Sequence, residues 1–140
     1  DIIGIGPGSL YTSIIANLII PYISEAIINS RAKKVFICNI MSEEGETDRL
    51  DCYGHLEKIT DHVKNLKIDY MLINNKIIES DILERYDREH KHPVYVDDSQ
   101  RAKIRELGVQ IIEDNLLRVS ETGQIMHDSE KVARILLDIL

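Results

Sequence analysis

The chain has 140 residues, a size that fits one domain or a piece of one. Hydrophobic residues make up 44% and charged residues 29%, which is close to the averages of globular domains and argues against disordered, collagen-like and coiled-coil chains. Seventeen Lys and Arg against 24 Asp and Glu give a formal net charge of −7, which argues against broad binding to the phosphate backbone of nucleic acids.

The first third of the chain predicts two buried strands separated by short helices. Residues 1–6 are rich in isoleucine, as in a parallel strand buried on both faces, and Gly6-Pro7-Gly8-Ser9 ends that strand. Apolar residues with helical spacing follow on both sides of Pro21, so we expect two short helices there. A second buried strand is predicted over 35–40, and a polar loop over 42–51.

The remainder of the chain continues the alternation of helices and strands. Apolar residues between 56 and 66 have the spacing of an amphipathic helix, and we place His55 and His62 on its exposed face. Further strands are predicted over 69–74, 93–96 and 109–112, and further helices over 77–86, 99–107 and 129–139. Ser99 and Ser129 are the expected N-caps, and residues 114–123 are a strand extension or a loop.

This alternation predicts an α/β fold. We expect a three-layer, Rossmann-like arrangement in which helices cover both faces of a mostly parallel sheet, with right-handed crossovers. Ligands of such sheets bind at the carboxyl ends of the strands. The loops that follow strands are therefore the first places to look for a site.

The start of the chain and its two cysteines indicate a cytoplasmic protein. Nothing at the N-terminus of this sequence reads as a signal peptide, and the apolar runs are shorter than the ~20 residues that a membrane span needs. Cys38 lies in a strand-like run and Cys52 in a predicted polar loop, which suits reduced thiols better than a disulfide. Because the chain lacks an initiator Met and opens directly on a strand, we expect a fragment of a longer protein.

The turn that follows the first strand is the first candidate site. Its glycines, Gly6 and Gly8, let the backbone approach a ligand closely, and the start of a helix offers free N–H groups and a partial positive charge. Hydroxyl groups at Ser9, Thr12 and Ser13 add hydrogen-bond donors. The dinucleotide and Walker patterns do not match, because the third glycine and the lysine that they need are missing. Two interpretations of this turn therefore stand side by side: a phosphate-binding loop, and a tight turn that leads into a capped helix.

The acidic loop over 43–48 follows the second strand and is the second candidate site. Neighbouring parallel strands place the loops that follow them at one edge, so this loop should lie beside the first. Its carboxylates suit a divalent metal beside a phosphate, sugar hydroxyls, or the role of a general base. Clustered acids also repel a phosphate when no cation intervenes, so a solvated acidic loop is the alternative.

Other polar groups are weaker candidates. His90 and His92 alternate as metal ligands can, but they precede a predicted strand and so fall on the wrong edge of the sheet. Arg118 follows the last predicted strand, where it either binds a phosphate through two N–H groups or lies at the surface. His127 and Asp128 either pair, with the carboxylate orienting the ring, or start a helix.

Several motifs together resemble a known family. They are GPGSLYTS over 6–13, CNIM over 38–41 with GETD over 45–48, and His127-Asp128 followed by Lys131-Val132. In this combination and spacing they are similar to the gluconeogenesis-factor (YvcK-like) family, which is related to 2-phospho-L-lactate transferase (CofD-like). The family's first glycine-rich loop, a GGGTG-type turn, has no counterpart here. The resemblance therefore implies that residues 1–140 form the C-terminal part of a longer α/β domain.

The resemblance implies a cytoplasmic regulatory protein that binds a nucleotide sugar such as UDP-N-acetylglucosamine and links carbon metabolism to cell shape and envelope growth. A phosphotransferase similar to 2-phospho-L-lactate transferase is the alternative. A Mg²⁺ ion that enters with a nucleotide diphosphate is the cofactor compatible with this family, and a homo-oligomer and regulatory protein partners are compatible with it too. No catalytic residue and no metal-ligand set is assigned.

The same resemblance, together with the two loops, gives a set of ligand-binding residues. Backbone N–H groups over 8–10 and the hydroxyls of Ser9 and Thr12 are expected to hold the diphosphate, while Tyr11 stacks on a ring. Asp48 or Glu46 is expected to take hydroxyls or a metal. The full set is Gly6, Gly8, Ser9, Leu10, Tyr11, Thr12, Asn39, Gly45, Glu46, Thr47, Asp48 and Arg118.

Overall fold

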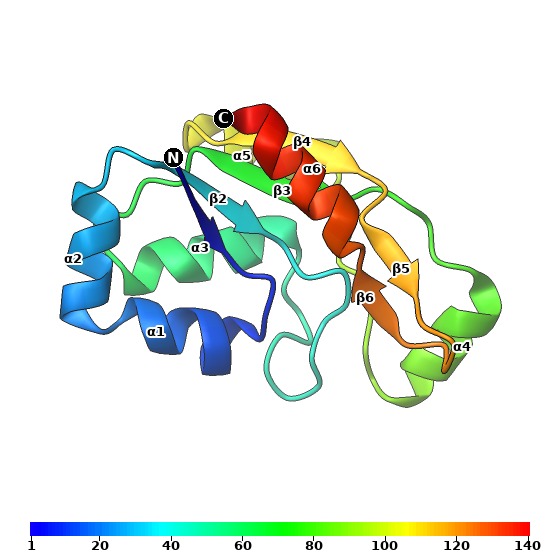
Figure 1. Cartoon of the computed structure of the whole chain (residues 1–140). Helices are drawn as coiled ribbons and strands as arrows, with labels where there is room; N and C mark the ends of the chain where they lie inside the picture. The colour runs from blue at the N-terminus through cyan, green and yellow to red at the C-terminus, as the bar shows by residue number, and fades with distance from the viewer.

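Four strands form one parallel sheet in the order β1-β2-β3-β4 in the computed structural model, which describes residues 1–140 (Figure 1). The strands are β1 (Ile2–Ile5), β2 (Lys33–Ile37), β3 (Tyr70–Asn74) and β4 (Gln110–Asp114). In the pairing of β1 with β2, Ile2 lies opposite Lys33 and Ile5 opposite Phe36. The carboxyl ends of these two strands therefore lie side by side, as the sequence predicts.

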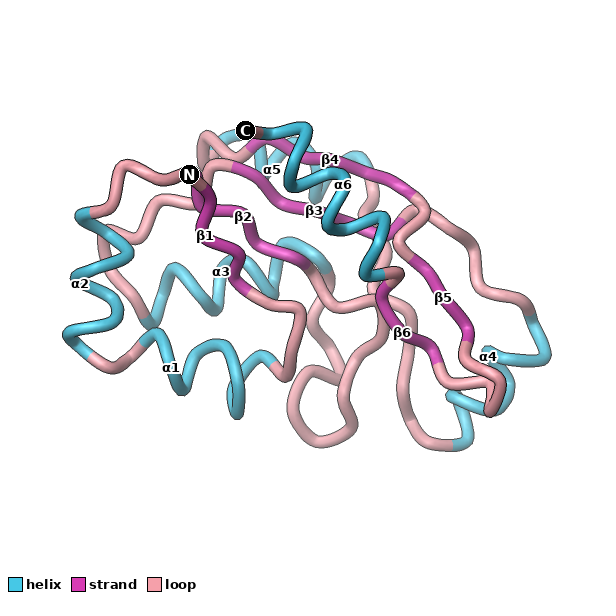
Figure 2. The backbone as a smooth tube through the Cα atoms, viewed as in Figure 1, coloured by secondary structure: helices cyan, strands magenta, loops and turns pink.

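Six α-helices and one π-helical turn connect the strands, and Figure 2 shows how they alternate with them along the chain. They are η1 (Leu10–Ile15), α1 (Ala16–Leu18), α2 (Pro21–Asn29), α3 (Cys52–His62), α4 (Ser80–Arg88), α5 (Asp98–Glu106) and α6 (Ser129–Ile139). The break before Pro21 separates two short helices, which confirms that prediction.

Helices cover both faces of the sheet (Figure 1). The η1, α1, α3 and α5 segments pack on one face around a core that includes Phe36, Leu56, Met71 and Ile104. The opposite face has a smaller core, in which Val132 of α6 is buried against residues of β2 and β3. The predicted three-layer, Rossmann-like α/β fold with a mostly parallel sheet is therefore confirmed.

The N-caps of two helices differ from the prediction by a few positions. Asp97, not Ser99, caps α5 by accepting a hydrogen bond from the backbone N–H of Gln100 at 2.7 Å. Asp128, not Ser129, caps α6 by accepting from Lys131 N–H at 3.1 Å. A carboxylate is the stronger acceptor at this position and also meets the positive end of the helix dipole, so the helices begin after the aspartates.

Helix α3 corrects two further predictions. It begins at Cys52, and Asp51 is its N-cap. Cys52 is therefore the first residue of a helix and not part of a polar loop, and its side chain is 0% exposed. His55 lies four residues before Ile59, one turn along the same core-facing side of the helix, and is 1% exposed, so its placement at the surface was wrong. His62 lies on the exposed face, as predicted.

Residues 93–96 do not form a strand. They run antiparallel to the segment after β2, where Met41 forms an isolated bridge with Pro93 and Val94 N–H donates to the Ile40 carbonyl at 2.9 Å. The second strand correspondingly ends at Ile37 rather than at residue 40, because the chain leaves the sheet to make this contact. The helix predicted over 77–86 is displaced and forms as α4.

A small hairpin takes the place of the predicted loop or strand extension after β4. Its strands, β5 (Leu117–Val119) and β6 (Ile125–His127), are antiparallel and do not join the main sheet. The hairpin contacts α4 instead: the Tyr86 hydroxyl accepts from Ile125 N–H at 2.7 Å, and the Arg85 guanidinium donates to the Gly123 carbonyl. These contacts bring two segments distant in sequence to one end of the sheet.

None of the helices is both long and apolar enough to cross a membrane by itself. Two helical segments separated by a bend of 75°, Leu10–Leu18 and Pro21–Asn29, are long and apolar enough for a span only when they are taken together.

Replacement of Gly6 by Ala should destabilise the fold, because Gly6 has a φ of +87° and an added Cβ would lie 2.9 Å from the Ile37 carbonyl oxygen. We expect Gly6→Ala to lower the free energy of unfolding by about 1–3 kcal/mol in urea denaturation. Gly4→Ala is the matched control, because a Cβ at Gly4 meets nothing within 4 Å. Equal stability of the two variants would contradict the close approach.

Candidate functional site

The loops that follow β1 and β2 meet at the carboxyl edge of the sheet. The Ser9 hydroxyl donates a hydrogen bond to Oε2 of Glu46 at 2.7 Å, across 37 positions of sequence. Thr12 Oγ1 donates in turn to Ser9 Oγ at 2.6 Å. The first and second candidate loops therefore form one site, and Ser9 is the residue that joins them.

The first loop leaves backbone donors free beside Ser9. Its carbonyl oxygen accepts from Ser13 N–H at 3.1 Å and from Ile14 N–H at 2.9 Å, so the helix begins directly after Ser9. The N–H groups of a first helical turn have no acceptor within the helix. They carry the partial positive charge of the helix start, which favours an anion at this end of the loop.

The second loop is held in shape by its own side chains. Thr47 is 0% exposed, and its hydroxyl oxygen accepts from Glu43 N–H at 2.8 Å. Asp48 is exposed, and its carboxylate accepts from Gly45 N–H at 2.9 Å, while Gly45 has a φ of +76°. Thr47 and Asp48 therefore shape the turn, and Glu46 is the acid that faces the first loop.

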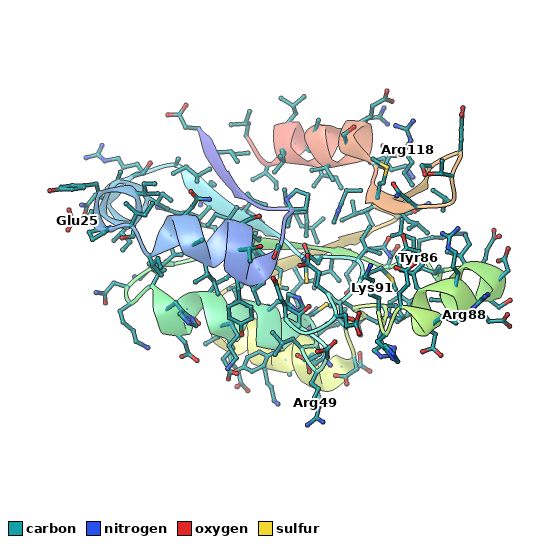
Figure 3. All side chains as sticks on the ribbon, turned by 90° about the horizontal axis from the view of Figure 1, so that it is seen from below. Glu25, Arg49, Tyr86, Arg88, Lys91 and Arg118 are labelled. Atoms are coloured by element: carbon teal, nitrogen blue, oxygen red, sulfur yellow. The ribbon has the colours of Figure 1, made fainter.

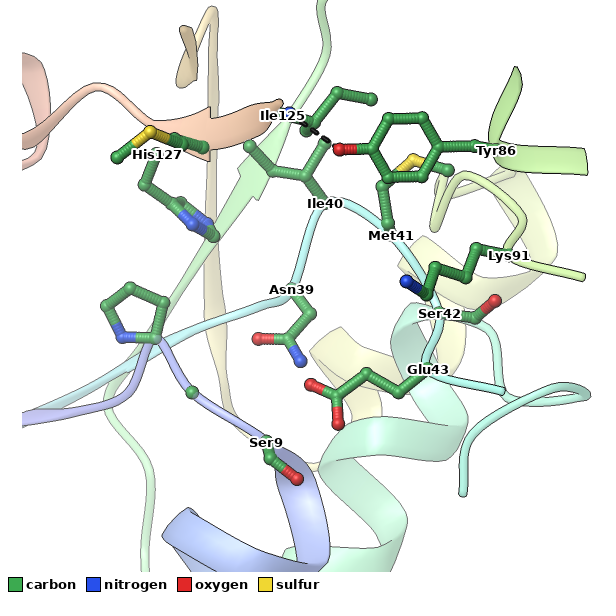
Figure 4. A pocket seen from close by; sticks show the side chains of 13 residues that line it. Ser9, Asn39, Ile40, Met41, Ser42, Glu43, Tyr86, Lys91, Ile125 and His127 are labelled. Atoms are coloured by element: carbon green, nitrogen blue, oxygen red, sulfur yellow. Dashed lines mark hydrogen bonds between the residues drawn. The ribbon is translucent and has the colours of Figure 1, made fainter. Parts of the chain in front are cut away.

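A cavity of about 420 Å³ opens beside these loops (Figure 4). Its polar side chains are Ser9, Asn39, Glu43, Lys91 and His127, together with Ser42 and the hydroxyl of Tyr86. Its other lining residues are Pro7, Gly8, Ile40, Met41, Ile125 and Met126. The loops after β1 and β2 supply one wall, and α4, the turn after it and β6 supply the opposite wall.

Lys91 brings a positive charge to a lining that is otherwise acidic or neutral. Its ammonium group lies 2.8 Å from the carboxylate of Glu89, and this hydrogen bond raises the pKa of Lys91 and lowers the pKa of Glu89. Lys91 therefore stays protonated at neutral pH and can pair with an anionic ligand. Nothing in the sequence indicated that Lys91 would line the cavity, because the segment that carries it was expected on the other edge of the sheet.

His127 and Asp128 do not form the dyad that was one of the two predictions for them. Nε2 of His127 lies 3.0 Å from the carbonyl oxygen of Cys38, and the Asp128 carboxylate caps α6. Burial lowers the pKa of His127. The alternative prediction, a role of Asp128 at a helix start, is the one that the structure bears out.

Several expected ligand-binding residues lie elsewhere. The Leu10 side chain is buried in the core, and Tyr11 packs edge-on against His62 with ring centroids 6.2 Å apart. Arg118 lies on the hairpin in a separate hollow with Ser120, and Figure 3 shows it near α6, away from Tyr86 and Lys91. Gly8, Ser9 and Asn39 do line the main cavity. Gly6 lines a neighbouring cavity of about 300 Å³ along β1.

The side chains that could bind a metal ion by themselves do not cluster in the structure. No group of three or more His, Cys, Asp and Glu residues is arranged to hold an ion. His92 instead lies 3.5 Å from a carboxylate oxygen of Asp87. Cys38 and Cys52 are free thiols with their Sγ atoms 3.9 Å apart, and the hydrogen bond between them and burial raise the pKa of Cys38.

Comparisons with known proteins match the whole chain. The family model of 2-phospho-L-lactate transferase CofD matches residues 1–117. The gluconeogenesis factor of Bacillus subtilis (strain 168) is 39% identical over 140 residues, which are 100% of this chain and 43% of that protein. The gluconeogenesis factor of Halalkalibacterium halodurans is 39% identical over 138 residues, which are 99% of this chain and 42% of that protein.

A solved structure is similar as well. The crystal structure of a member of the UPF0052 family from Bacillus halodurans has a TM-score of 0.90 and 38% identity, covering 98% of this chain and 43% of that chain. This chain therefore spans less than half the length of the relatives that it matches.

Two buried histidines predict how stability depends on pH. Burial lowers the pKa of both His55 and His127 in the folded state. The unfolded chain therefore binds more protons as the pH falls through about 6.5, the ordinary value of histidine, and the free energy of unfolding should decrease from pH 7.5 to pH 5.5. Urea denaturation at both pH values measures this difference.

Variants separate the two histidines from the other titrating groups. His55→Gln should make the decrease between pH 7.5 and pH 5.5 smaller, and His62→Gln, on the exposed face of the same helix, is the matched control. A wild-type chain equally stable at both pH values would refute the assignment.

Proposed function

The chain belongs to the family of 2-phospho-L-lactate transferase CofD and is a homologue of gluconeogenesis factors, and we propose that it supplies the diphosphate-binding part of a nucleotide-sugar sensor. UDP-N-acetylglucosamine is the expected ligand. The hydrogen bond from Ser9 to Glu46 is the observation that carries the proposal, because it joins the two loops into one polar surface beside the free helix start.

The lining of the cavity suits a ligand with an anionic end and a less polar end. Gly8 and Ser9 line one side, next to the free N–H groups of the helix start, from which a diphosphate would accept hydrogen bonds. Ile40 and Met41 from the loop after β2 and Ile125 from β6 lie on the side of Tyr86 (Figure 4) and offer apolar surface to a sugar or base ring. This division is typical of small-molecule sites, in which a few polar groups fix the orientation of the ligand.

The acids of the second loop make a cation part of the proposal. Glu43 lines the cavity and Glu46 lies next to Ser9, so a diphosphate there would be repelled by two carboxylates unless their charge were offset. Lys91 lines the cavity too, but its ammonium group is already paired with Glu89, so a further cation is needed to offset these two charges. Mg²⁺ is held in such sites by one or two carboxylates together with phosphate oxygens, and these two glutamates fit that donor set. We therefore expect Mg²⁺ to enter with the nucleotide rather than to occupy a site of its own.

A regulatory role fits the way in which the side chains of the site are already engaged. Asp48 accepts a hydrogen bond from its own loop, and Thr47 is buried in that loop, so neither is held against a nucleophile or a leaving group. The gluconeogenesis factors among the relatives favour control of carbon metabolism. We extend this to a cytoplasmic protein that connects nucleotide-sugar supply to cell shape and envelope growth through protein partners.

A phosphotransferase is the second candidate function. The match of residues 1–117 to the transferase model favours it, since this stretch includes both loops of the site. In that case Asp48 or Glu46 would place a metal on the phosphate, and the acceptor would bind at the opposite wall. Consumption of the nucleotide over time separates a transferase from a sensor.

Calorimetric titration of the full-length protein with UDP-N-acetylglucosamine in the presence of Mg²⁺ tests the sensor. Ser9→Ala should weaken binding about tenfold, because it removes the hydroxyl that holds the Glu46 carboxylate and so releases that carboxylate toward the phosphates. The control is Ser99→Ala, which removes an exposed hydroxyl outside the cavity lining.

The choice of nucleotides decides between the functions. Selective binding of UDP-N-acetylglucosamine over UDP and GDP, without turnover, supports the sensor. Binding of GDP with release of product supports the transferase, and equal affinity of Ser9→Ala and wild type would refute the assignment of the loop.

A further inference from the structure

His127 has a fixed tautomer. Its Nε2 atom lies 3.0 Å from the Cys38 carbonyl oxygen, which can only accept a hydrogen bond, so Nε2 carries the proton and donates it. Burial lowers the pKa of His127, which keeps the ring neutral at pH 7. A neutral imidazole with its proton on Nε2 has a free lone pair on Nδ1. The Nδ1 atom can therefore only accept.

The ring belongs to the lining of the cavity. Figure 4 shows the imidazole of His127 pointing from β6 into the cavity, on the side where Asn39 lies. The carbonyl that fixes the ring belongs to Cys38, the residue after the end of β2 and directly before Asn39. The orientation of His127 is thus set by the same strand that carries the second loop.

The groups that suit an anion lie away from the His127 ring. The helix start after Ser9 has free N–H groups, and Lys91 lies across the cavity from His127 in Figure 4, whereas Nδ1 of His127 supplies an acceptor, which phosphate oxygens avoid. The two walls are thus complementary to different parts of one ligand. A hydroxyl or an amide N–H is the kind of group that fits against His127.

The position of His127 in the sequence links it to specificity. The match to the transferase model ends at residue 117, before the hairpin strand that carries His127. The gluconeogenesis factors match through the end of the chain. Strand β6 therefore lies outside the stretch that matches the transferase model and inside the stretch that matches the gluconeogenesis factors.

We propose that His127 is a specificity-determining residue that accepts a hydrogen bond through Nδ1 from a hydroxyl or amide donor of the sugar part of the bound nucleotide sugar. This inference rests on the proposed function and deepens it. The acceptor orients the ligand with its diphosphate toward Ser9 and its donor groups toward β6. It also disfavours a ligand that would place a phosphate directly against the His127 ring.

Two substitutions separate this role from a structural one. His127→Gln places an amide donor near the position of Nε2 and can keep the bond to the Cys38 carbonyl, but it leaves no acceptor near Nδ1. His127→Asn places an amide oxygen near Nδ1 but is too short to reach Cys38. If the acceptor matters, Gln should weaken the binding of UDP-N-acetylglucosamine to the full-length protein about fivefold, and Asn should weaken it less.

The comparison with UDP locates the contact. UDP lacks the N-acetylglucosamine that is expected to contact His127, so wild type and His127→Gln should bind UDP with the same affinity. An unchanged affinity of His127→Gln for UDP-N-acetylglucosamine, or an equal loss for UDP, would overturn the inference. If wild type binds none of the nucleotides, the proposed function fails first, and the inference falls with it.

A ligand-independent measurement checks the tautomer. The ¹⁵N chemical shifts of the imidazole in the free full-length protein should show a neutral ring protonated at Nε2 at pH 7.5. A ring protonated at Nδ1 would overturn the inference while leaving the proposed function untouched.

Discussion

The close approach of two backbone segments at Gly6 sets the geometry of the whole site. β1 turns there so near to the end of β2 that the Ile37 carbonyl oxygen leaves no room for a side chain. Because β1 and β2 are parallel and in register, the loops after them emerge at one edge and within reach of each other. The short contact between Ser9 and Glu46 is a consequence of that turn, and a larger residue at Gly6 would separate the loops.

The architecture could be predicted from the sequence because the strands are short apolar runs and the helices show apolar residues at helical spacing. An isoleucine-rich run indicated β1, an apolar run over 35–40 indicated β2, and Gly6 and Gly8 marked the turn between β1 and the first helix. It was insufficient where a contact distant in sequence decided the outcome. His55 is polar by type but lies one turn before Ile59 on the core face of α3, where it is buried. Lys91 reaches the site because its segment pairs with Met41 instead of forming a strand.

The two walls of the cavity differ in chemistry and in how they are built. The wall made by the loops after β1 and β2 rests on the central sheet and holds the hydroxyls, the acids and the free N–H groups. The wall made by α4 and the hairpin holds Lys91, His127 and apolar side chains. Under the proposed function, the first wall would bind the phosphates and the opposite wall would select the rest of the ligand.

The hairpin is attached to the molecule by a few separate contacts rather than by a shared sheet. The Tyr86 hydroxyl, the Arg85 guanidinium and the ring of His127 hold it, while its strands pair only with each other. Parts of a protein that are held in this manner open at a lower free energy than its central strands. The hairpin should therefore open more readily than the central sheet, and a molecule bound between the walls would fasten it to the sheet and slow the exchange of its amide hydrogens.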